Sequence, residues 1–309
     1  MMHKNMNNTV NSRYLRTIGC FSLLTLFVQQ SHADTPEIPA LPIQKGLFLD
    51  LDANMGVELK DGKRVKAWHN QVAGNAADVF VKQDKGRKVA GSGRPTLKAD
   101  VGEIGGNSTL IFEEQELINI DEDAFDHMTT GSGYTWFSVM SVYKQNVGKK
   151  DVNSFFGNLR NGPLYEGFWG NLMDDNRVWM GSRNGIKNKG KPTLWHEKLN
   201  PCVVSKEPIA ENRYYLIMGR MGAGQKVVGL ELFINSATPV DRQPVPVSSK
   251  ANASKMAIGQ ERDATEHPRK ESFHGEIARF LVYERPLSNA ELSQIIQFLI
   301  RFYQLEIKD

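Results

Sequence analysis

The sequence predicts an all-β fold, a two-sheet antiparallel jelly-roll β-sandwich with a C-terminal helix. From Leu47 onward, short apolar runs alternate with clusters of Gly, Asn, Asp and Lys, as in strands joined by turns. The chain ends in a buried-strand pattern, Glu276–Tyr283, followed by a helical pattern. Strands and helices do not alternate as a parallel sheet would require. These observations together favour an antiparallel sandwich.

The predicted strands are short segments spread over the whole chain. They are Leu47–Leu51, Val79–Val81, Thr109–Phe112, Leu117–Ile120, Thr135–Tyr143, Ser154–Asn158, Val178–Ser182, Tyr214–Arg220, Val227–Asn235, Lys255–Gly259 and Glu276–Tyr283.

The final helix carries a complete start signal. Ser288 and Glu291 have the spacing of a capping box, in which each side chain bonds the other residue's amide. Leu287 and Leu292 have the spacing of a hydrophobic staple. One apolar face follows at helical spacing. It consists of Leu292, Ile295, Ile296, Leu299 and Tyr303.

Residues 1–33 have the pattern of a secretory signal peptide. Basic residues precede an apolar run, Ile18–Val28, and small residues lie near Ala33. The run is too short for a transmembrane span, which needs about 20 residues. We therefore expect a secreted or periplasmic protein with a linker at 34–45 and one domain at 46–309.

Removing this leader balances the charge. The 38 Lys and Arg residues face 35 Asp and Glu, and the leader holds three basic and no acidic residues, which leaves 35 of each sign. This balance does not favour a nucleic-acid partner. Of the two cysteines only Cys202 remains, so no intrachain disulfide is expected, and Cys202 is interpreted as a buried apolar residue.

Several stretches resemble the LamG-like jelly-roll domains of the concanavalin A-like lectin/glucanase superfamily. They are LFLDLDAN at 47–54, VKAWHNQVAGN at 65–75, RPTL at 94–97, TLIF at 109–112 and FHGEIARFLVYERPLS at 273–288. The resemblance implies two curved sheets packed face to face, often with carbohydrate on the concave face. It does not imply catalysis, because this fold hosts binders, hydrolases and lyases. The acid–x–Asp–x–x–Glu run of retaining glucanases is missing from every predicted strand.

The densest polar segment runs from Glu261 to Glu276, between two predicted strands. Glu261, Asp263 and His267 could supply an acid–base pair if the protein is an enzyme. Arg262 could hold an anionic group, and Arg220 could approach the same sheet edge. The alternative is a solvated, ion-paired loop.

Aromatic residues concentrate between Asn161 and Asn200, where three of the five tryptophans lie. An aromatic face can pack on a sugar ring while Arg bonds its hydroxyls. The ligand-binding candidates here are Trp169, Trp195 and Arg183. The alternative is that these rings fill the core.

Metal signals are weak, and no cofactor is expected. Asp50, Asp52 and Asn54 have acidic spacing, but Gly56 is misplaced for an EF-hand loop. A structural Ca²⁺ between loops stays open.

The sequence therefore favours a secreted protein that binds a polysaccharide or other glycan of the bacterial envelope. A glycoside hydrolase or lyase using the 261–276 loop is the first alternative. A non-catalytic protein-interaction module is the second.

Overall fold

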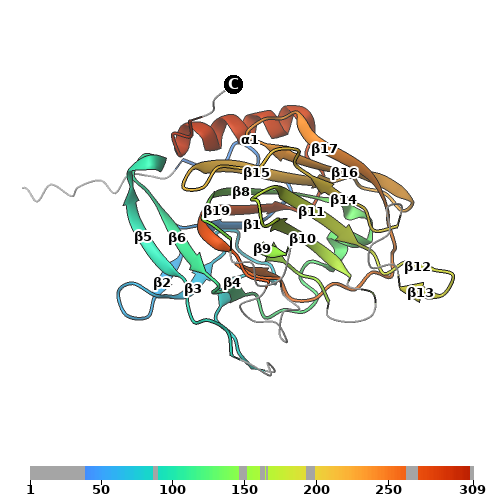
Figure 1. Cartoon of the computed structure of the whole chain (residues 1–309), viewed down its shortest axis with the longest axis horizontal. Coiled ribbons are helices and arrows are strands. Elements are labelled where there is room, and N and C mark those ends of the chain that lie inside the picture. The colour runs from blue at the N-terminus through green and yellow to red at the C-terminus, as the bar shows by residue number, and fades with distance from the viewer. Residues whose placement is uncertain are drawn as a thin grey trace, which may run out of the picture. The chain divides into compact units, whose positions relative to one another are not determined.

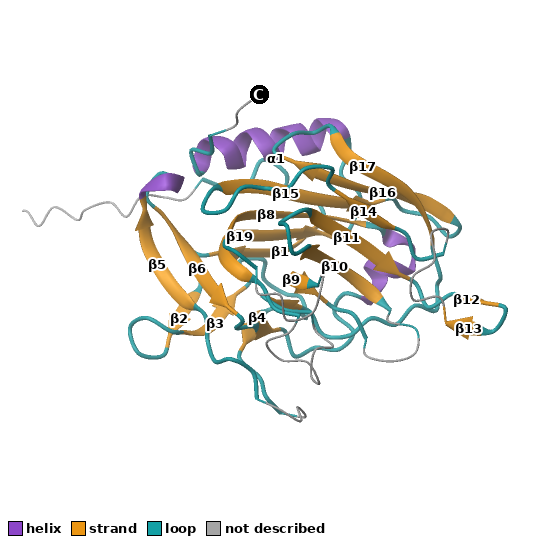
Figure 2. Ribbon diagram, viewed as in Figure 1, coloured by secondary structure: helices purple, strands orange, loops and turns teal. Residues whose placement is uncertain are grey.

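A computed structural model describes residues 39–85, 90–145, 152–160, 164, 166–192, 199–261 and 271–306. Residues Leu41–Asp309 form one compact unit. It contains two antiparallel β-sheets and a C-terminal α-helix, which confirms the predicted fold class (Figures 1 and 2). The start of the unit is held by contacts with the rest of it, since Leu41 is buried and Tyr283 Oη donates to Ile43 O at 2.8 Å.

Sheet I is the sheet covered by the helix. Its strand order is β17-β16-β15-β8-β19-β6-β5, and β1 pairs with the part of β19 that β6 leaves open. The strands are β1 (Leu47–Asp52), β5 (Thr96–Val101), β6 (Asn107–Glu113), β8 (Tyr134–Val142), β15 (Tyr214–Met221), β16 (Val227–Ile234), β17 (Pro239–Pro246) and β19 (His274–Tyr283).

Sheet II has the order β14-β11-β10-β9-β18-β7-β4-β3-β2. Its strands are β2 (Val57–Leu59), β3 (Val65–His69), β4 (Val79–Val81), β7 (Leu117–Ile118), β9 (Asn153–Gly157), β10 (Gly167–Leu172), β11 (Val178–Arg183), β14 (Cys202–Val204) and β18 (Ala257–Ile258). A separate hairpin joins β12 (Lys187–Asn188) to β13 (Lys191–Pro192), and two short helical turns span Gly102–Ile104 and Met128–Ser132.

The main core lies between the two sheets. Alternate residues of β8, such as Trp136, point into it, while Phe137 points to the other face of sheet I. Trp136 packs edge-to-face on Phe156 of sheet II, with ring centroids 5.0 Å apart. Each such fully buried side chain contributes roughly 1.5–3 kcal/mol of transfer free energy.

Helix α1 (Asn289–Phe302) covers the outer face of sheet I (Figure 1). The predicted capping box is confirmed: Glu291 N donates to Ser288 Oγ, and Ser288 N donates to Glu291 Oε2 at 2.9 Å. Hydrogen bonds from Arg285 and Ser288 lower the pKa of Glu291 to about 2. All five predicted apolar-face residues of this helix segment are buried.

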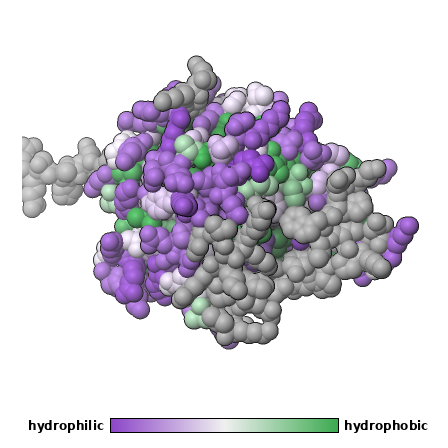
Figure 3. All heavy atoms as spheres, in the orientation of Figure 1, coloured by the Kyte–Doolittle hydropathy of each residue, from purple (hydrophilic) through white to green (hydrophobic). Residues whose placement is uncertain are grey.

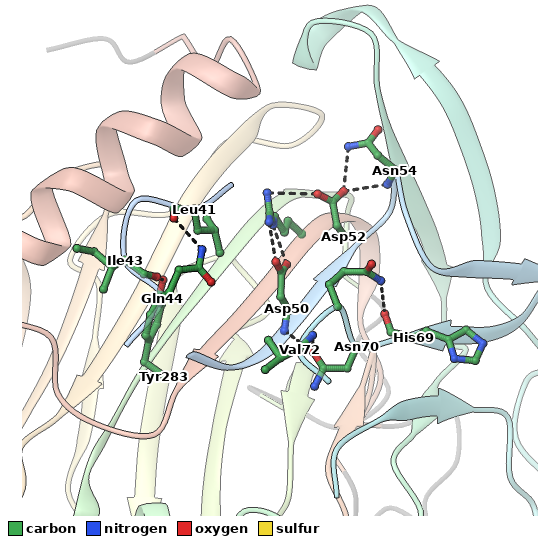
Figure 4. Close-up of polar contacts among 12 residues, drawn as sticks. Leu41, Ile43, Gln44, Asp50, Asp52, Asn54, His69, Asn70, Val72 and Tyr283 are labelled. Carbon is green, nitrogen blue, oxygen red and sulfur yellow. Dashed lines mark hydrogen bonds and ion pairs between the residues drawn. The ribbon is translucent and has the colours of Figure 1, made fainter. Parts of the chain in front are cut away.

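A buried polar network joins β1 to the helix end. Figure 4 shows Asp50 and Asp52 on the same side of β1. Arg279 Nη1 lies 3.2 Å from Asp52 Oδ2, and Tyr303 Oη donates to Asp52 Oδ1 at 3.4 Å. Burial raises the pKa of Asp52, an effect that the Arg279 charge opposes. Asp50 and Asp52, whose spacing in the sequence resembled that of metal ligands, therefore belong to an ion-pair network on a strand.

All eleven predicted strands are confirmed within a few residues. Sequence patterns missed several others, notably β10 and β17. Strand β10 contains two glycines, and β17 contains three prolines, which are tolerated because β17 is an edge strand.

Candidate functional site

The outer face of β9, β10 and β11 is buried and carries both aromatic and polar side chains. Every residue of these three strands is buried. Phe168 and Met180 point into the main core, so the residues that alternate with them face away from it. Burying polar side chains costs free energy unless they are hydrogen-bonded, so the polar side chains on this face need partners. We call this surface the β9–β11 face.

Trp169 lies at the centre of the β9–β11 face between two glycines. It pairs with Gly157 on β9 and with Gly181 on β11. A Cβ atom at position 181 would overlap Trp169 Cζ2 and Cη2, so the indole lies directly over the β11 backbone. The absence of a side chain at Gly181 makes this ring position possible.

Arg183 and Trp179 complete the surroundings of this indole. The Arg183 guanidinium carbon is 5.3 Å from the Trp169 ring centroid, a cation–π geometry. Trp179 packs edge-to-face on Trp169 with centroids 5.6 Å apart. Trp169 is 1% exposed and Arg183 is 5% exposed, so both are held in place by packing.

Asn171 fixes the orientation of the indole. In the amide orientation that satisfies both of its polar atoms, its nitrogen donates to Ser154 Oγ at 2.5 Å. Its oxygen then accepts from Trp169 Nε1 at 3.3 Å. The polar groups of the face are therefore connected rather than isolated.

Glu261 borders the face from the β9 side. A Cβ atom at Gly157 would lie 3.6 Å from Glu261 Cα and Cγ and 3.3 Å from Trp169 Cβ, which places the carboxylate chain beside Trp169. Glu261 N donates to Glu271 O at 3.4 Å, next to the antiparallel bridge between Gln260 and Ser272. Residues opposite each other in such a bridge share a face, so Glu271 accompanies Glu261.

The structure brings together three of the residues predicted from sequence: Trp169, Arg183 and Glu261. Arg262, Asp263, His267 and Trp195 lie outside the described residues. Gly157, Gly181 and Glu271 were not singled out, because their role depends on which strands pair. In the sequence, only the position of Glu271 within the polar segment Glu261–Glu276 could have drawn attention to it.

Arg220 lies elsewhere, on the helix-covered face of sheet I. Its Nη2 is 2.6 Å from Glu231 Oε2, and its Nη1 donates to Leu287 O at 2.7 Å and to Asn289 Oδ1 at 2.9 Å. These contacts hold the start of α1. Arg220 therefore does not join Glu261, contrary to the expectation from sequence.

Cys202 on β14 is not a thiolate at neutral pH. Burial raises the pKa of its thiol to about 11, although the Arg183 charge acts in the opposite direction. A nucleophilic cysteine needs a lowered pKa. Cys202 is half-buried rather than fully buried as expected from the sequence, and it packs against the apolar cluster of Leu159, Trp169 and Trp179.

The described part of the chain contains no group of three or more His, Cys, Asp or Glu residues placed to hold a metal ion. None of its helices has the length and apolar content needed to cross a bilayer.

No family model and no curated protein matches this sequence. Among solved structures, the chain is similar to a Ruminococcus gnavus IT-sialidase CBM40 bound to alpha2,3 sialyllactose, with 16% identity, a TM-score of 0.38, and coverage of 55% of this chain and 83% of that one. It is similar to Trypanosoma rangeli sialidase in complex with sialic acid, with 11% identity, a TM-score of 0.48, and coverage of 86% and 35%. It is similar to the NanB sialidase from Streptococcus pneumoniae, with 14% identity, a TM-score of 0.40, and coverage of 59% and 26%. The chain thus spans about a third or less of the two sialidases. At TM-scores below 0.5, these similarities assign the chain to no family.

Proposed function

We propose that this chain is an exported carbohydrate-binding β-sandwich protein whose ligand contacts the β9–β11 face. The observation that carries the proposal is the placement of Trp169, seated on Gly181 with Arg183 over its ring. An aromatic face supplies apolar contact for a sugar ring, and adjacent charged groups supply directed hydrogen bonds. Asn171 and Glu261 add polar groups on the same face.

Burial of this face sets a condition on binding. Because Trp169 is 1% exposed, a sugar ring can stack on it only after the Arg183 guanidinium and the other covering atoms move. Binding that requires such a change is slower than binding to a preformed surface. Slow association is therefore part of the proposal.

A glycan array probed with the processed protein tests this function. Arg183→Gln should reduce binding by about tenfold or more, since it removes a charge-assisted hydrogen-bond donor. Arg242→Ala is the matched control, because Arg242 is exposed on edge strand β17. A protein that binds no glycan on the array, yet retains its fold, would be a protein-interaction module instead.

A second candidate function is cleavage of a polysaccharide by Glu261. It is favoured by one observation, the pairing of Glu261 with Glu271 across the Gln260–Ser272 bridge beside Trp169. Two neighbouring carboxylates are what glycoside hydrolysis uses. Incubation with polysaccharides should then release reducing ends or unsaturated uronates, and Glu261→Gln should abolish the release. Glu58→Gln, at an exposed ion pair on β2, is the control.

Export is the remaining part of the proposal. The basic and apolar pattern of residues 1–33 supports it. Mass spectrometry of the protein recovered outside the cytoplasm should find Asp34 at the N-terminus.

A further inference from the structure

The structure has a hollow whose lining shares no residue with the β9–β11 face. It is a groove of about 630 Å³ between the segment Ser205–Ile209 and the turn that joins β16 to β17. Tyr215 and Ile234, which belong to the main core or pack on it, form its floor. We call it the end groove. Its lining is Ser205, Lys206, Glu207, Pro208, Ile209, Tyr215, Ile234, Asn235, Ser236 and Val240.

The first wall of the end groove is tied to sheet II. Ser205 N donates to Val178 O at 2.8 Å, and Ser205 Oγ accepts from Val178 N at 2.9 Å while donating to Glu207 O at 2.8 Å. Further along, Ala210 N donates to Tyr215 Oη at 3.0 Å. This wall is therefore held open by hydrogen bonds to its own sandwich.

The second wall is tied to sheet I. Asn235 adopts a left-handed conformation with φ of 55°, which asparagine tolerates better than most residues. Its backbone N donates to Leu216 O, and its Oδ1 accepts from Leu216 N, both at 2.7 Å. Thr238 N donates to Ser236 Oγ at 3.1 Å. Two fixed walls make a preformed site, and preformed sites bind at a lower entropic cost.

The chemistry of the lining separates into a floor and a rim. The floor is apolar. Ile234 and Val240 are partly exposed there, whereas Tyr215 is 9% exposed and has the Arg213 guanidinium carbon 5.3 Å from its ring centroid. The rim holds the exposed side chains of Lys206 and Glu207, which form no ion pair within the described residues. The two charges are adjacent in sequence and of opposite sign, so the rim has no net charge.

We propose that the end groove binds a neutral sugar residue. A sugar ring has an apolar face for the Ile234 and Val240 side chains and hydroxyl groups that both donate and accept at the Lys206–Glu207 rim. A purely apolar ligand would desolvate both rim charges without replacing their hydrogen bonds. An anionic ligand would pair with Lys206 but be repelled by Glu207, and a cationic ligand would pair with Glu207 but be repelled by Lys206. The volume lies within the range of small-molecule sites, roughly 300–1,000 Å³.

Methyl NMR on the full chain tests the proposal with defined probes. The probes are neutral oligosaccharides of glucose, mannose, galactose and N-acetylglucosamine, with sialyllactose and a uronate oligomer as charged comparisons. Saturable shifts of the Ile209, Ile234 and Val240 methyls with a neutral probe support the proposal. Methyls of Ile258 and Ile277, deep in the main core, should stay fixed.

Variants complete the test. Ser236→Trp fills the groove from an exposed position and should remove the shifts, whereas Ser249→Trp, exposed outside the groove, should not. The Lys206→Ala, Glu207→Ala double variant should weaken binding by about tenfold, as expected for losing hydrogen bonds from charged groups. Shifts with only charged probes, or with none, would overturn the proposal. Shifts confined to Leu159, beside Trp169, would also overturn it while supporting the β9–β11 face.

Discussion

Arg279 forms a two-pronged ion pair with Asp50. Its Nε lies 2.8 Å from Asp50 Oδ1, and its Nη2 lies 2.7 Å from Asp50 Oδ2. The guanidinium is 3% exposed, so water screens this pair very little. Removing one partner leaves the other charge buried and unpaired, which is the costly change.

Arg279→Ala should therefore lower the free energy of unfolding by about 3–5 kcal/mol. Urea denaturation followed by tryptophan fluorescence measures the change. Arg242→Ala on an exposed edge should change it by less than about 0.5 kcal/mol. Equal effects of the two substitutions would show that the ion pair contributes little.

Ionisation of Asp126 makes the stability of the folded protein depend on pH. Burial and the nearby Asp123 raise its pKa to about 6, above the unfolded value of 3.8. A carboxyl whose pKa rises on folding contributes stability below the unfolded value, and that stability is lost as pH rises through about 6. Asp126→Asn should raise the melting temperature at pH 7.5 and leave it nearly unchanged at pH 4. A constant difference across this range would contradict the assignment.

The Tyr214 hydroxyl stabilises a buried carboxylate. It donates to Glu276, which also accepts from Tyr143 Oη at 2.5 Å and pairs with Lys98 Nζ at 3.1 Å. Burial first, and then Glu276, raise the pKa of both tyrosines. Their neutral forms thus stabilise the fold below about pH 10, and this contribution is lost as pH rises further.

Tyr214→Phe should cost about 1.5–3 kcal/mol, because it removes a hydrogen bond to a charged group. Denaturation at pH 7 measures this loss. An absorbance titration at 295 nm should show tyrosines in the folded protein ionising above the usual value. Ionisation of every tyrosine near pH 10 before unfolding would refute the description.

Gly181→Ala tests whether glycan binding depends on the position of the Trp169 ring. The added methyl would overlap the Trp169 ring, so the indole must move. Glycan binding should fall by about tenfold or more, and tryptophan emission should shift. Gly229→Ala is the matched control, because no atom lies within 4 Å of the added carbon. Unchanged binding by the Gly181 variant would remove Trp169 from the site.

Local signals explain what could be predicted about the fold. The capping box at Ser288 and the apolar spacing of the last helix are encoded locally, between Ser288 and Tyr303, and both are confirmed. Strand β17 could not be predicted in this way, because its prolines are compatible only with an edge, and sequence does not show which strands are edges.

Which side chains meet on the β9–β11 face also could not be predicted from local sequence. Residue type alone drew attention to Trp169, Arg183 and Glu261. Their proximity follows from the register that sets Trp169 between Gly157 and Gly181, and register depends on contacts distant in sequence. Arg220 looked similar by type, yet its strand belongs to the other sheet. On the side that Figure 3 shows, the coloured residues are mostly hydrophilic and do not mark this face.

The pairing of β1 with β19 has a consequence for how the chain reaches its native state. Leu51 is the register partner of Phe280, so the opening strand stays without this neighbour until the end of the polypeptide has been synthesised. Contacts so remote along the chain slow folding. The first strand can therefore take its place in sheet I only after β19 has been synthesised.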